Sequence, residues 1–300
     1  MSTPADKQDW IEIKARCTAN TADAISTMLE QLGALAVTYE DAEDSPILEP
    51  RPGERRLWPN TEVTGLFAQG TDATAIVQTL QQILGDSIPL AAVKLADKDW
   101  IRAWMDQFKP LRFGSRLWIC PTWHQVPDKE AVTVMLDPGL AFGTGTHPTT
   151  ALCLEWLDRQ DLTNARVLDY GCGSGILAVA ALKLGASEAL GVDIDPQALL
   201  ASKENAQRNG VDSKLTLKDG ATLDLSTITP YNLAIANILA GPLAELEPYI
   251  AALTAKGAPL ALSGILQEQA EEVIAAYSPD FSYQGQEVKD GWVRLSFVRC

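Results

Sequence analysis

The chain has 300 residues, of which 46% are hydrophobic and 21% are charged, a balance typical of a soluble globular protein with one large or two modest domains. Its formal net charge of −15 disfavours direct nucleic-acid recognition, because phosphate repels an acidic surface, and favours a basic protein partner. The five cysteines are scattered and include no C-x-x-C pair, so they indicate neither a disulfide framework nor a zinc site, and we expect no metal.

Residues 1–9 are polar and carry no apolar signal segment. No apolar run later in the chain approaches the ~18 residues that a membrane span requires. We therefore expect a cytoplasmic protein that makes no membrane contact.

Hydrophobic periodicity predicts a strand, a helix, two strands, a helix and a strand in the first third of the chain. The predicted strands are Trp10–Cys17, Leu35–Glu40, Thr61–Gln69 and Ala91–Ala96, and the predicted helices are Thr21–Gly33 and Asp72–Gly85. This βαββαβ order is typical of a small ferredoxin-like α+β domain, which we place at residues 1–96. The long loop Asp41–Asn60 has two interpretations, a substrate contact or a solvated excursion, and the second is favoured.

A helix that ends at Pro110 is predicted next, over Asp97–Lys109, and residues 97–114 are interpreted as an interdomain linker helix. Trp100, Trp104 and Phe108 recur every four residues along it. An aromatic stripe at that spacing is more typical of packing than of contact with a cofactor's adenine.

A glycine-rich stretch, DPGLAFGTGTHPTT over Asp137–Thr150, follows the predicted strands Arg116–Pro121 and Ala131–Leu136. It is not a Walker phosphate loop, because the sixth position from Gly139 is threonine and no lysine follows. Two interpretations remain, a lid over a bound ligand that leads into the helix Thr149–Leu157, or a tight turn without a ligand. We interpret His147 as a hydrogen-bonded structural residue rather than a catalyst.

A second glycine loop, VLDYGCGSG over Val167–Gly175, joins a buried strand to the helix Ile176–Leu184. The backbone N–H groups at such a helix start favour a ligand that lies against bare backbone. The dinucleotide fingerprint G-x-G-x-x-G fails because Ile176 occupies its last glycine position. The remaining pattern, D-x-G-x-G-x-G, resembles the first motif of S-adenosylmethionine-dependent methyltransferases, so Gly171, Gly173 and Gly175 are candidate cofactor-binding residues.

The rest of the chain alternates strands and helices, which predicts a doubly wound α/β sheet with its ligand at the carboxyl ends of the strands. The predicted strands are Glu188–Val192, Lys214–Leu217, Tyr231–Ala236, Ala258–Leu262, Ser282–Lys289 and Trp292–Arg299, and the predicted helices are Pro196–Asn209, one running past Pro242 to Leu253, and Gln267–Ala276. Asp193 follows the second strand at a distance from Gly171 of 193 − 171 = 22 residues, where an acid can hold ribose hydroxyls. Asp195 is interpreted as a helix cap, and Asp219 and Gly220 as either an adenine contact or a simple turn. The last two strands form an antiparallel edge, so we predict a Rossmann-like seven-stranded methyltransferase sheet over residues 115–300.

Four longer strings carry a resemblance to a known family: LDPGLAFGTGTHPTT (Leu136–Thr150), DYGCGSGILA (Asp169–Ala178), GVDIDP (Gly191–Pro196) and ANILAGPL (Ala236–Leu243). They are similar to the PrmA family, the bacterial ribosomal protein L11 methyltransferases, and DKDWIRAWMDQFKPLRFG (Asp97–Gly114) resembles that family's linker. The resemblance implies S-adenosyl-L-methionine as cofactor and S-adenosyl-L-homocysteine as product. It also implies that the cofactor contacts are Thr150, Gly171, Asp193 and Asn237.

The family further implies trimethylation of the N-terminal α-amine and lysine ε-amines of a basic large-subunit ribosomal protein, which the N-terminal domain docks. Amino methyltransferases commonly carry a tetrad Asn or Asp-Pro-Pro-aromatic, whereas this chain has Asn237-Ile238-Leu239-Ala240. The lack of an aromatic ring in this segment argues against clamping a flipped nucleobase. The alternative is a methyltransferase that acts on an amine of a small molecule or nucleic acid.

We assign Asn237 as the catalytic residue. Its side-chain carbonyl is expected to accept an amine hydrogen and to orient the nitrogen lone pair toward the methyl group. We expect the chain to act as a monomer.

Overall fold

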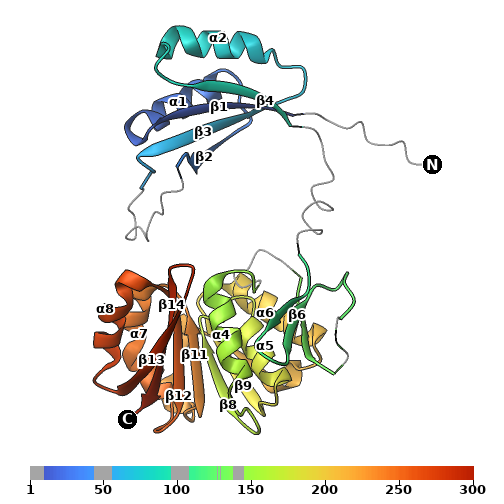
Figure 1. Cartoon of the computed structure of the whole chain (residues 1–300), viewed down its shortest axis with the longest axis vertical. Helices are drawn as coiled ribbons and strands as arrows, with labels where there is room; N and C mark the ends of the chain where they lie inside the picture. Colours follow the sequence, from blue (N-terminus) through green and yellow to red (C-terminus); the bar gives the residue numbers. More distant parts are fainter. Residues whose placement is uncertain (1–9, 44–55, 96–107, 127, 129, 138–144) are drawn as a thin grey trace, which may run out of the picture. The chain divides into compact units, whose positions relative to one another are not determined.

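Figure 1 shows the chain in a computed structural model, which describes residues 10–43, 56–95, 108–126, 128, 130–137 and 145–300. The chain divides into two compact units, Met1–Asp106 and Gln107–Cys300. The predicted linker helix lies almost entirely outside the described residues, as do most of the Asp41–Asn60 loop and the middle of the Asp137–Thr150 loop, so these interpretations stay predictions. None of the helices in the described ranges has the length and apolarity of a membrane span.

The N-terminal unit has the predicted ferredoxin-like fold. Its elements are β1 (Trp10–Thr18), α1 (Ala19–Gln31), β2 (Ala36–Asp41), β3 (Asn60–Phe67), α2 (Ala73–Leu84) and β4 (Leu90–Leu95). The strands form an antiparallel sheet in the order β2-β3-β1-β4. Ile13, Ile25 and Leu80, from β1 and the two helices, are fully buried in one shared core. The alternation along β1 places every second side chain in this core, which is why the strand was readable from the sequence.

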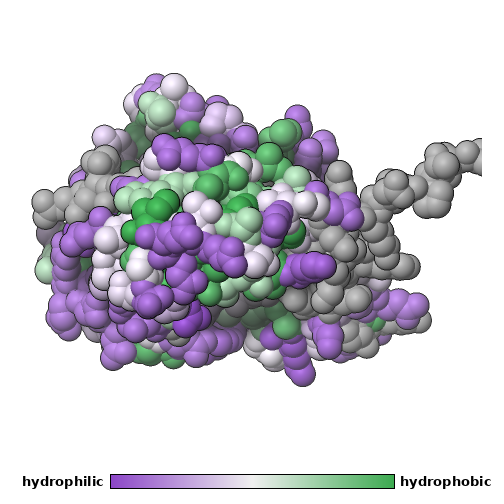
Figure 2. All heavy atoms as spheres, turned by 90° about the horizontal axis from the view of Figure 1, so that it is seen from above, coloured by the Kyte–Doolittle hydropathy of each residue, from purple (hydrophilic) through white to green (hydrophobic). Residues whose placement is uncertain are grey.

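The face of the molecule seen in Figure 2 mixes hydrophilic side chains with smaller apolar areas. Among the described residues of the N-terminal unit, the large hydrophobic side chains that remain exposed are Leu35, Ile83 and Val93. They lie close to or within β2, α2 and β4 and do not belong to the core of that unit.

The C-terminal unit is built on a seven-stranded sheet in the order β10-β9-β8-β11-β12-β14-β13. The strands are β8 (Arg166–Tyr170), β9 (Glu188–Asp193), β10 (Leu215–Asp219), β11 (Leu233–Asn237), β12 (Pro259–Leu266), β13 (Phe281–Lys289) and β14 (Trp292–Arg299). The helices are α4 (Pro148–Asp158), α5 (Ile176–Lys183), α6 (Pro196–Arg208), α7 (Ala240–Leu253) and α8 (Ala270–Tyr277). β14 runs antiparallel to both of its neighbours, and the pairs among β8 to β12 are parallel. The predicted doubly wound methyltransferase sheet is confirmed.

Side chains from both faces of the sheet are buried in separate cores. Helices cover both faces (Figure 1). On β8, Val167 enters the core beneath α4 and α5, whereas its neighbour Leu168 enters the core beneath α7 and α8. Burial on both faces produces a continuous apolar run rather than an alternating one, as the sequence indicated for this strand.

Two elements differ from the sequence prediction. A small three-stranded sheet of β5 (Leu111–Phe113), β6 (Leu117–Cys120) and β7 (Val132–Met135) precedes α4, and β5 was not predicted. β12 extends four residues beyond the predicted end at Leu262, because its pairing with β14 shifts register between Leu262 and Ile265. Gly264, at φ 88°, occupies this irregularity, where a strand can bend and still continue.

Candidate active site

A cavity of about 500 Å³ opens at the carboxyl ends of the parallel strands. Its wall is formed by residues at the ends of β8, β9, β11 and β12, by the start of β14 and by the first turns of α4 and α7. The lining residues are His147, Thr149, Tyr170, Gly171, Gly173, Val192, Asp193, Ile194, Gly220, Asn237, Ile238, Leu239, Pro242, Leu246, Gly264 and Trp292. The position agrees with the general rule that open α/β sheets bind ligands beyond their strand ends.

The glycine loop presents backbone to this cavity. Gly171, Gly173 and Gly175 have φ of 76°, 53° and 75°, a region that side chains disfavour. A Cβ on Gly171 would collide with the side chain of Ile238 across the cavity wall. Glycine is therefore required here for both conformation and space.

The loop is tied to its neighbours from behind. The hydroxyl of Ser202, on α6, donates to the Gly173 carbonyl at 2.9 Å. A Cβ on Gly175 would lie 2.7 Å from that same hydroxyl oxygen. Gly175 is the left-handed N-cap of α5 and is absent from the cavity wall, so it supports the loop without facing the cavity.

Asp193 lines the cavity at the end of β9. Its Oδ2 accepts from the Gly173 N–H at 2.8 Å, and its Oδ1 accepts from the Asp195 N–H at 3.0 Å. Each carboxylate oxygen keeps a second lone pair, which is available to a hydroxyl donor in the cavity. The same backbone contacts hold the carboxylate in place, so it is preorganised for a diol such as ribose. Asp195 caps α6 through the Gln197 N–H, as predicted.

Asp169, to which the sequence reading assigned no role, lies behind the loop. Its Oδ2 accepts from the Ala178 N–H at 3.0 Å, and its Oδ1 is buried with no hydrogen-bond partner among the described residues. Burial, with a smaller contribution from the charge of Asp193, raises the pKa of this carboxyl to about 7.

Asn237, at the end of β11, is joined to α4. Its Nδ2 donates to Thr150 Oγ1 at 3.2 Å, and Thr150 is completely buried. The other end of the amide, Oδ1, is buried and has no partner within the described part of the chain. Asn237 lines the cavity and one N–H of its amide is bonded to Thr150, so Oδ1 is left as a buried acceptor without a donor in the described chain.

Gly220 follows β10, near one edge of the sheet, and Trp292 begins β14, near the other edge. His147 and Trp292 therefore lie at one end of the cavity and Gly220 at the other. His147 is the N-cap of α4, where Nδ1 accepts from the Thr149 N–H at 3.3 Å. Its ring centroid lies 4.9 Å from that of Trp292, and the ring planes are inclined by 69°. Partial burial lowers the pKa of His147 below the usual value of histidine, so the ring is neutral at pH 7.

Comparison with known proteins agrees with this geometry. The family model described as "Ribosomal protein L11 methyltransferase (PrmA)" matches residues 9–300. A ribosomal protein L11 methyltransferase of Actinobacillus pleuropneumoniae serotype 3 is 54% identical over 295 residues, which are 97% of this chain and 99% of that protein. One from Klebsiella pneumoniae is 53% identical over 289 residues, covering 96% and 98% of the two chains. This chain belongs to the PrmA family.

Among solved structures, the ribosomal protein L11 methylase of Lactobacillus delbrueckii subsp. bulgaricus is 33% identical. The match has a TM-score of 0.58 and covers 64% of this chain and all but 1% of the other. The PrmA family uses S-adenosylmethionine as its methyl donor. Bare backbone at Gly171 and a held carboxylate at Asp193 fit the amino acid and ribose parts of such a donor, respectively.

The structure brings four of the six predicted site residues of this PrmA protein to the cavity wall: Gly171, Gly173, Asp193 and Asn237. Thr150 and Gly175 lie behind that wall. The aromatic and apolar lining from β14 and α7 was not predicted, because side chains such as Trp292 and Leu246 reach the cavity only through sheet order and helix packing. Among the described residues, no group of three His, Cys, Asp or Glu side chains is placed to hold a metal ion.

Proposed function

We propose that this chain transfers methyl groups from S-adenosylmethionine to amino groups of ribosomal protein L11, namely the N-terminal α-amine and lysine ε-amines, up to the trimethylated state. The observation that carries the proposal is Asn237 Oδ1, a buried acceptor without a partner in the described chain, on a residue that lines the same cavity as the glycine loop. A buried acceptor without a donor is costly unless a ligand supplies one, and an amine N–H is such a donor. Family membership over residues 9–300 supports the same substrate.

Gly171 and Gly173 hold the amino acid part of the donor through their backbone, and Asp193 accepts from its ribose hydroxyls. Gly220 and Ile194 lie at the end of the cavity that is suited to the adenine. Thr150 and Gly175 act indirectly, Thr150 by holding the Asn237 amide and Gly175 by shaping the loop. S-adenosylmethionine, when bound, supplies a methyl group that is electrophilic because it is attached to a sulfonium.

Methyl transfer to nitrogen requires a neutral amine whose lone pair points at the methyl carbon. Deprotonation at pH 7 costs about 4.6 kcal/mol for a lysine of pKa ~10.4 and about 1.4 kcal/mol for an α-amine of pKa ~8. The apolar side chains of Ile238, Leu239 and Leu246 in the cavity wall disfavour the charged form, so the proton leaves to water as the amine enters. Asn237 Oδ1 then accepts a remaining N–H and fixes the direction of the lone pair.

The N-terminal domain, residues 1–96, docks the ribosomal protein, and the segment 97–114 links it to the catalytic domain, residues 115–300. Leu35, Ile83 and Val93 are exposed apolar side chains that a protein partner can cover. The net charge of −15 attracts a basic partner. In this proposal the protein works as a monomer in the cytoplasm, where ribosomal proteins are assembled.

The test is incubation of the full chain and methyl-labelled S-adenosylmethionine with unmodified ribosomes and, separately, with free unmodified L11. Mass spectrometry of the products then locates the label. We expect label on L11 amines, and an Asp193→Ala variant serves as a control that retains the fold and loses donor affinity. Label on RNA or on a small molecule instead of L11 would contradict the proposal.

A further inference from the structure

The cavity extends along the strand ends beyond the residues assigned to the donor. Its wall follows the strand order from Gly220 after β10, through Asp193 on β9 and Gly171 after β8, to Asn237 on β11. It then continues past Asn237 to Gly264 on β12 and Trp292 on β14. The donor occupies the first part in the function proposed above. The part beyond Asn237 is therefore left for the acceptor amine.

An aromatic corner, formed by the rings of His147 and Trp292, closes this acceptor end. Because the ring planes are inclined by 69° at a centroid distance of 4.9 Å, they form two walls rather than a stack. Aromatic cages that bind methylated ammonium groups are lined by ring faces of this kind. Burial keeps His147 neutral at pH 7, so the corner does not repel a cation.

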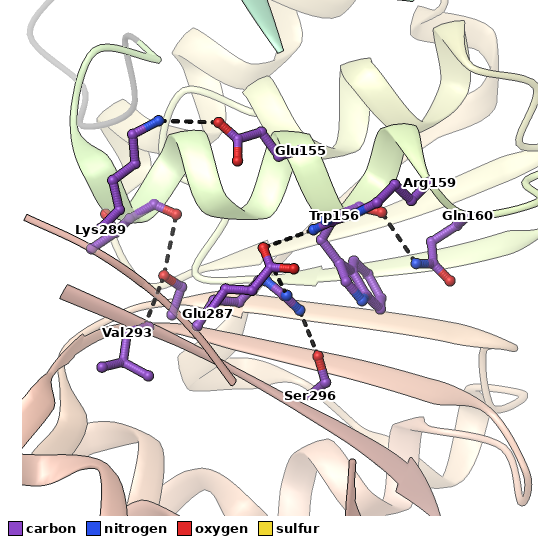
Figure 3. Close-up of polar contacts among 11 residues, drawn as sticks. Glu155, Trp156, Arg159, Gln160, Glu287, Lys289, Val293 and Ser296 are labelled. Carbon is purple, nitrogen blue, oxygen red and sulfur yellow. Dashed lines mark hydrogen bonds and ion pairs between the residues drawn. The ribbon is translucent and has the colours of Figure 1, made fainter. Parts of the chain in front are cut away.

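The corner is fixed by contacts on both elements that carry it. Ser263 Oγ, in the β12 irregularity, donates to the Thr149 carbonyl at 3.2 Å, beside His147 in the first turn of α4. Lys289, at the end of β13, is paired with Glu155 of α4 at 3.0 Å, and Arg159, directly after α4, is paired with Glu287 at 2.8 Å (Figure 3). The β13–β14 hairpin that presents Trp292 is thus tied to the helix that His147 caps.

The acceptor loses its N–H groups as it is methylated. The neutral, unmodified primary amine has two N–H groups and has one after the first methylation, so Asn237 Oδ1 can orient either form. After the second methylation the neutral nitrogen is a tertiary amine without N–H, and a carbonyl oxygen cannot orient it. Its two methyl groups, and the positive charge that forms on nitrogen during the third transfer, need another contact.

We propose that Trp292, together with His147, provides that contact and so determines whether methylation proceeds from the dimethyl to the trimethyl state. Each transfer forms one N–C bond and breaks one S–C bond, whose electron pair stays on sulfur. After the first and second transfers the nitrogen loses a proton to water, and the third transfer yields a quaternary ammonium. Asn237 orients the first two acceptors, and the aromatic corner orients the third. This inference rests on the proposed function.

The experiment uses the full chain with two substrates, unmodified L11 and L11 whose amines have all been dimethylated chemically with formaldehyde and a borohydride reductant. At saturating S-adenosylmethionine, intact-mass measurement gives the rate of the first transfer on one substrate and of the third on the other. For Trp292→Leu we expect the third transfer to slow about tenfold or more and the first to slow less than about threefold, since the ring contributes mainly to the cation. Trp292→Phe keeps a ring and should stay within about threefold of the natural protein on both substrates.

Two controls complete the design. Asn237→Ala should show the opposite pattern, with the first transfer slowed more than the third. Tyr283→Leu changes an aromatic side chain on the same hairpin that contacts Phe297 rather than the cavity, and it should leave both rates as they are. Thermal unfolding and S-adenosylmethionine affinity check that each variant is folded and binds the donor.

Equal slowing of both transfers in Trp292→Leu, or equal loss in Trp292→Phe and Trp292→Leu, would overturn the inference. If the natural protein places no methyl group on unmodified L11, the proposed function itself fails. Methylation of unmodified L11 that stops at the dimethyl state in the natural protein would leave the proposed reaction standing and refute the role of the corner.

Discussion

Thr150 offers a test of how the acceptor oxygen is aimed. The resemblance implies that Thr150 contacts the cofactor, yet it is fully buried and absent from the cavity wall, and its Oγ1 accepts from Asn237 Nδ2 at 3.2 Å. In Thr150→Val the amide loses this partner and can rotate, so Oδ1 is no longer held in one orientation. A neutral hydrogen bond contributes about 1 kcal/mol, so we expect kcat to fall about fivefold, with Thr150→Ser close to the natural protein.

The assay is methyl transfer to free L11 at saturating substrates, with donor affinity measured separately by calorimetry. If Thr150 acts through Asn237, Thr150→Val lowers kcat while the Kd for S-adenosylmethionine changes less than about threefold. A weakened Kd with unchanged kcat would refute this reasoning and restore a direct cofactor contact. Failure of Thr150→Ser to recover kcat would refute it as well.

Three further predictions concern stability and association. Gly175→Ala should lower the free energy of unfolding by about 2–4 kcal/mol in urea denaturation, because a Cβ at φ 75° would lie 2.7 Å from Ser202 Oγ. A loss below about 1 kcal/mol would show instead that α6 moves away from the added methyl group at little cost. The pKa of Asp169 is raised to about 7 in the folded state, so its contribution to stability is present at low pH and is lost as the pH rises through about 7. Between pH 5 and 8 the free energy of unfolding of the natural protein should therefore fall by about 2 kcal/mol more than that of Asp169→Asn. If the free energies of unfolding of the two proteins change in parallel with pH, the buried carboxyl is not the cause. The net charge of −15 should make association with L11 slower at physiological than at low ionic strength in stopped-flow measurements, and a flat dependence would exclude electrostatic steering.

The elements that were predicted correctly are those whose pattern is local. β1 alternates because one of its faces is buried, and β14 was predicted with its observed bounds. Asp195 was readable as the cap of α6 because a short acid before a proline at the first helical position is a local signal. β5 was missed because it has only three residues, and the end of β12 was misplaced because Gly264 bends a strand that the pairing with β14 continues.

The residues of the site also divide into those that the sequence predicts and those that it does not. Gly171, Gly173, Asp193 and Asn237 each follow a recognisable strand, and parallel strands in a doubly wound sheet bring their carboxyl ends to one edge. Trp292 follows no such rule, because it begins a strand that is antiparallel to its neighbours and therefore starts where the others end. Its contact with His147 joins residues 145 positions apart (292 − 147), which no spacing in the sequence indicates.

The sequence alone therefore determined the class of this protein, its glycine loop and its family, and it predicted Asp193 as the ribose carboxylate, since each depends on residues that are neighbours along the chain or follow a known motif. Only the tertiary structure decided that Thr150 holds Asn237 from behind and that Asn237 Oδ1 is left without a partner in the described chain. It also decided that the rings of His147 and Trp292 meet in the wall of the cavity. These features arise from the order of strands in the sheet and from helix packing, which bring together side chains that the sequence keeps far apart.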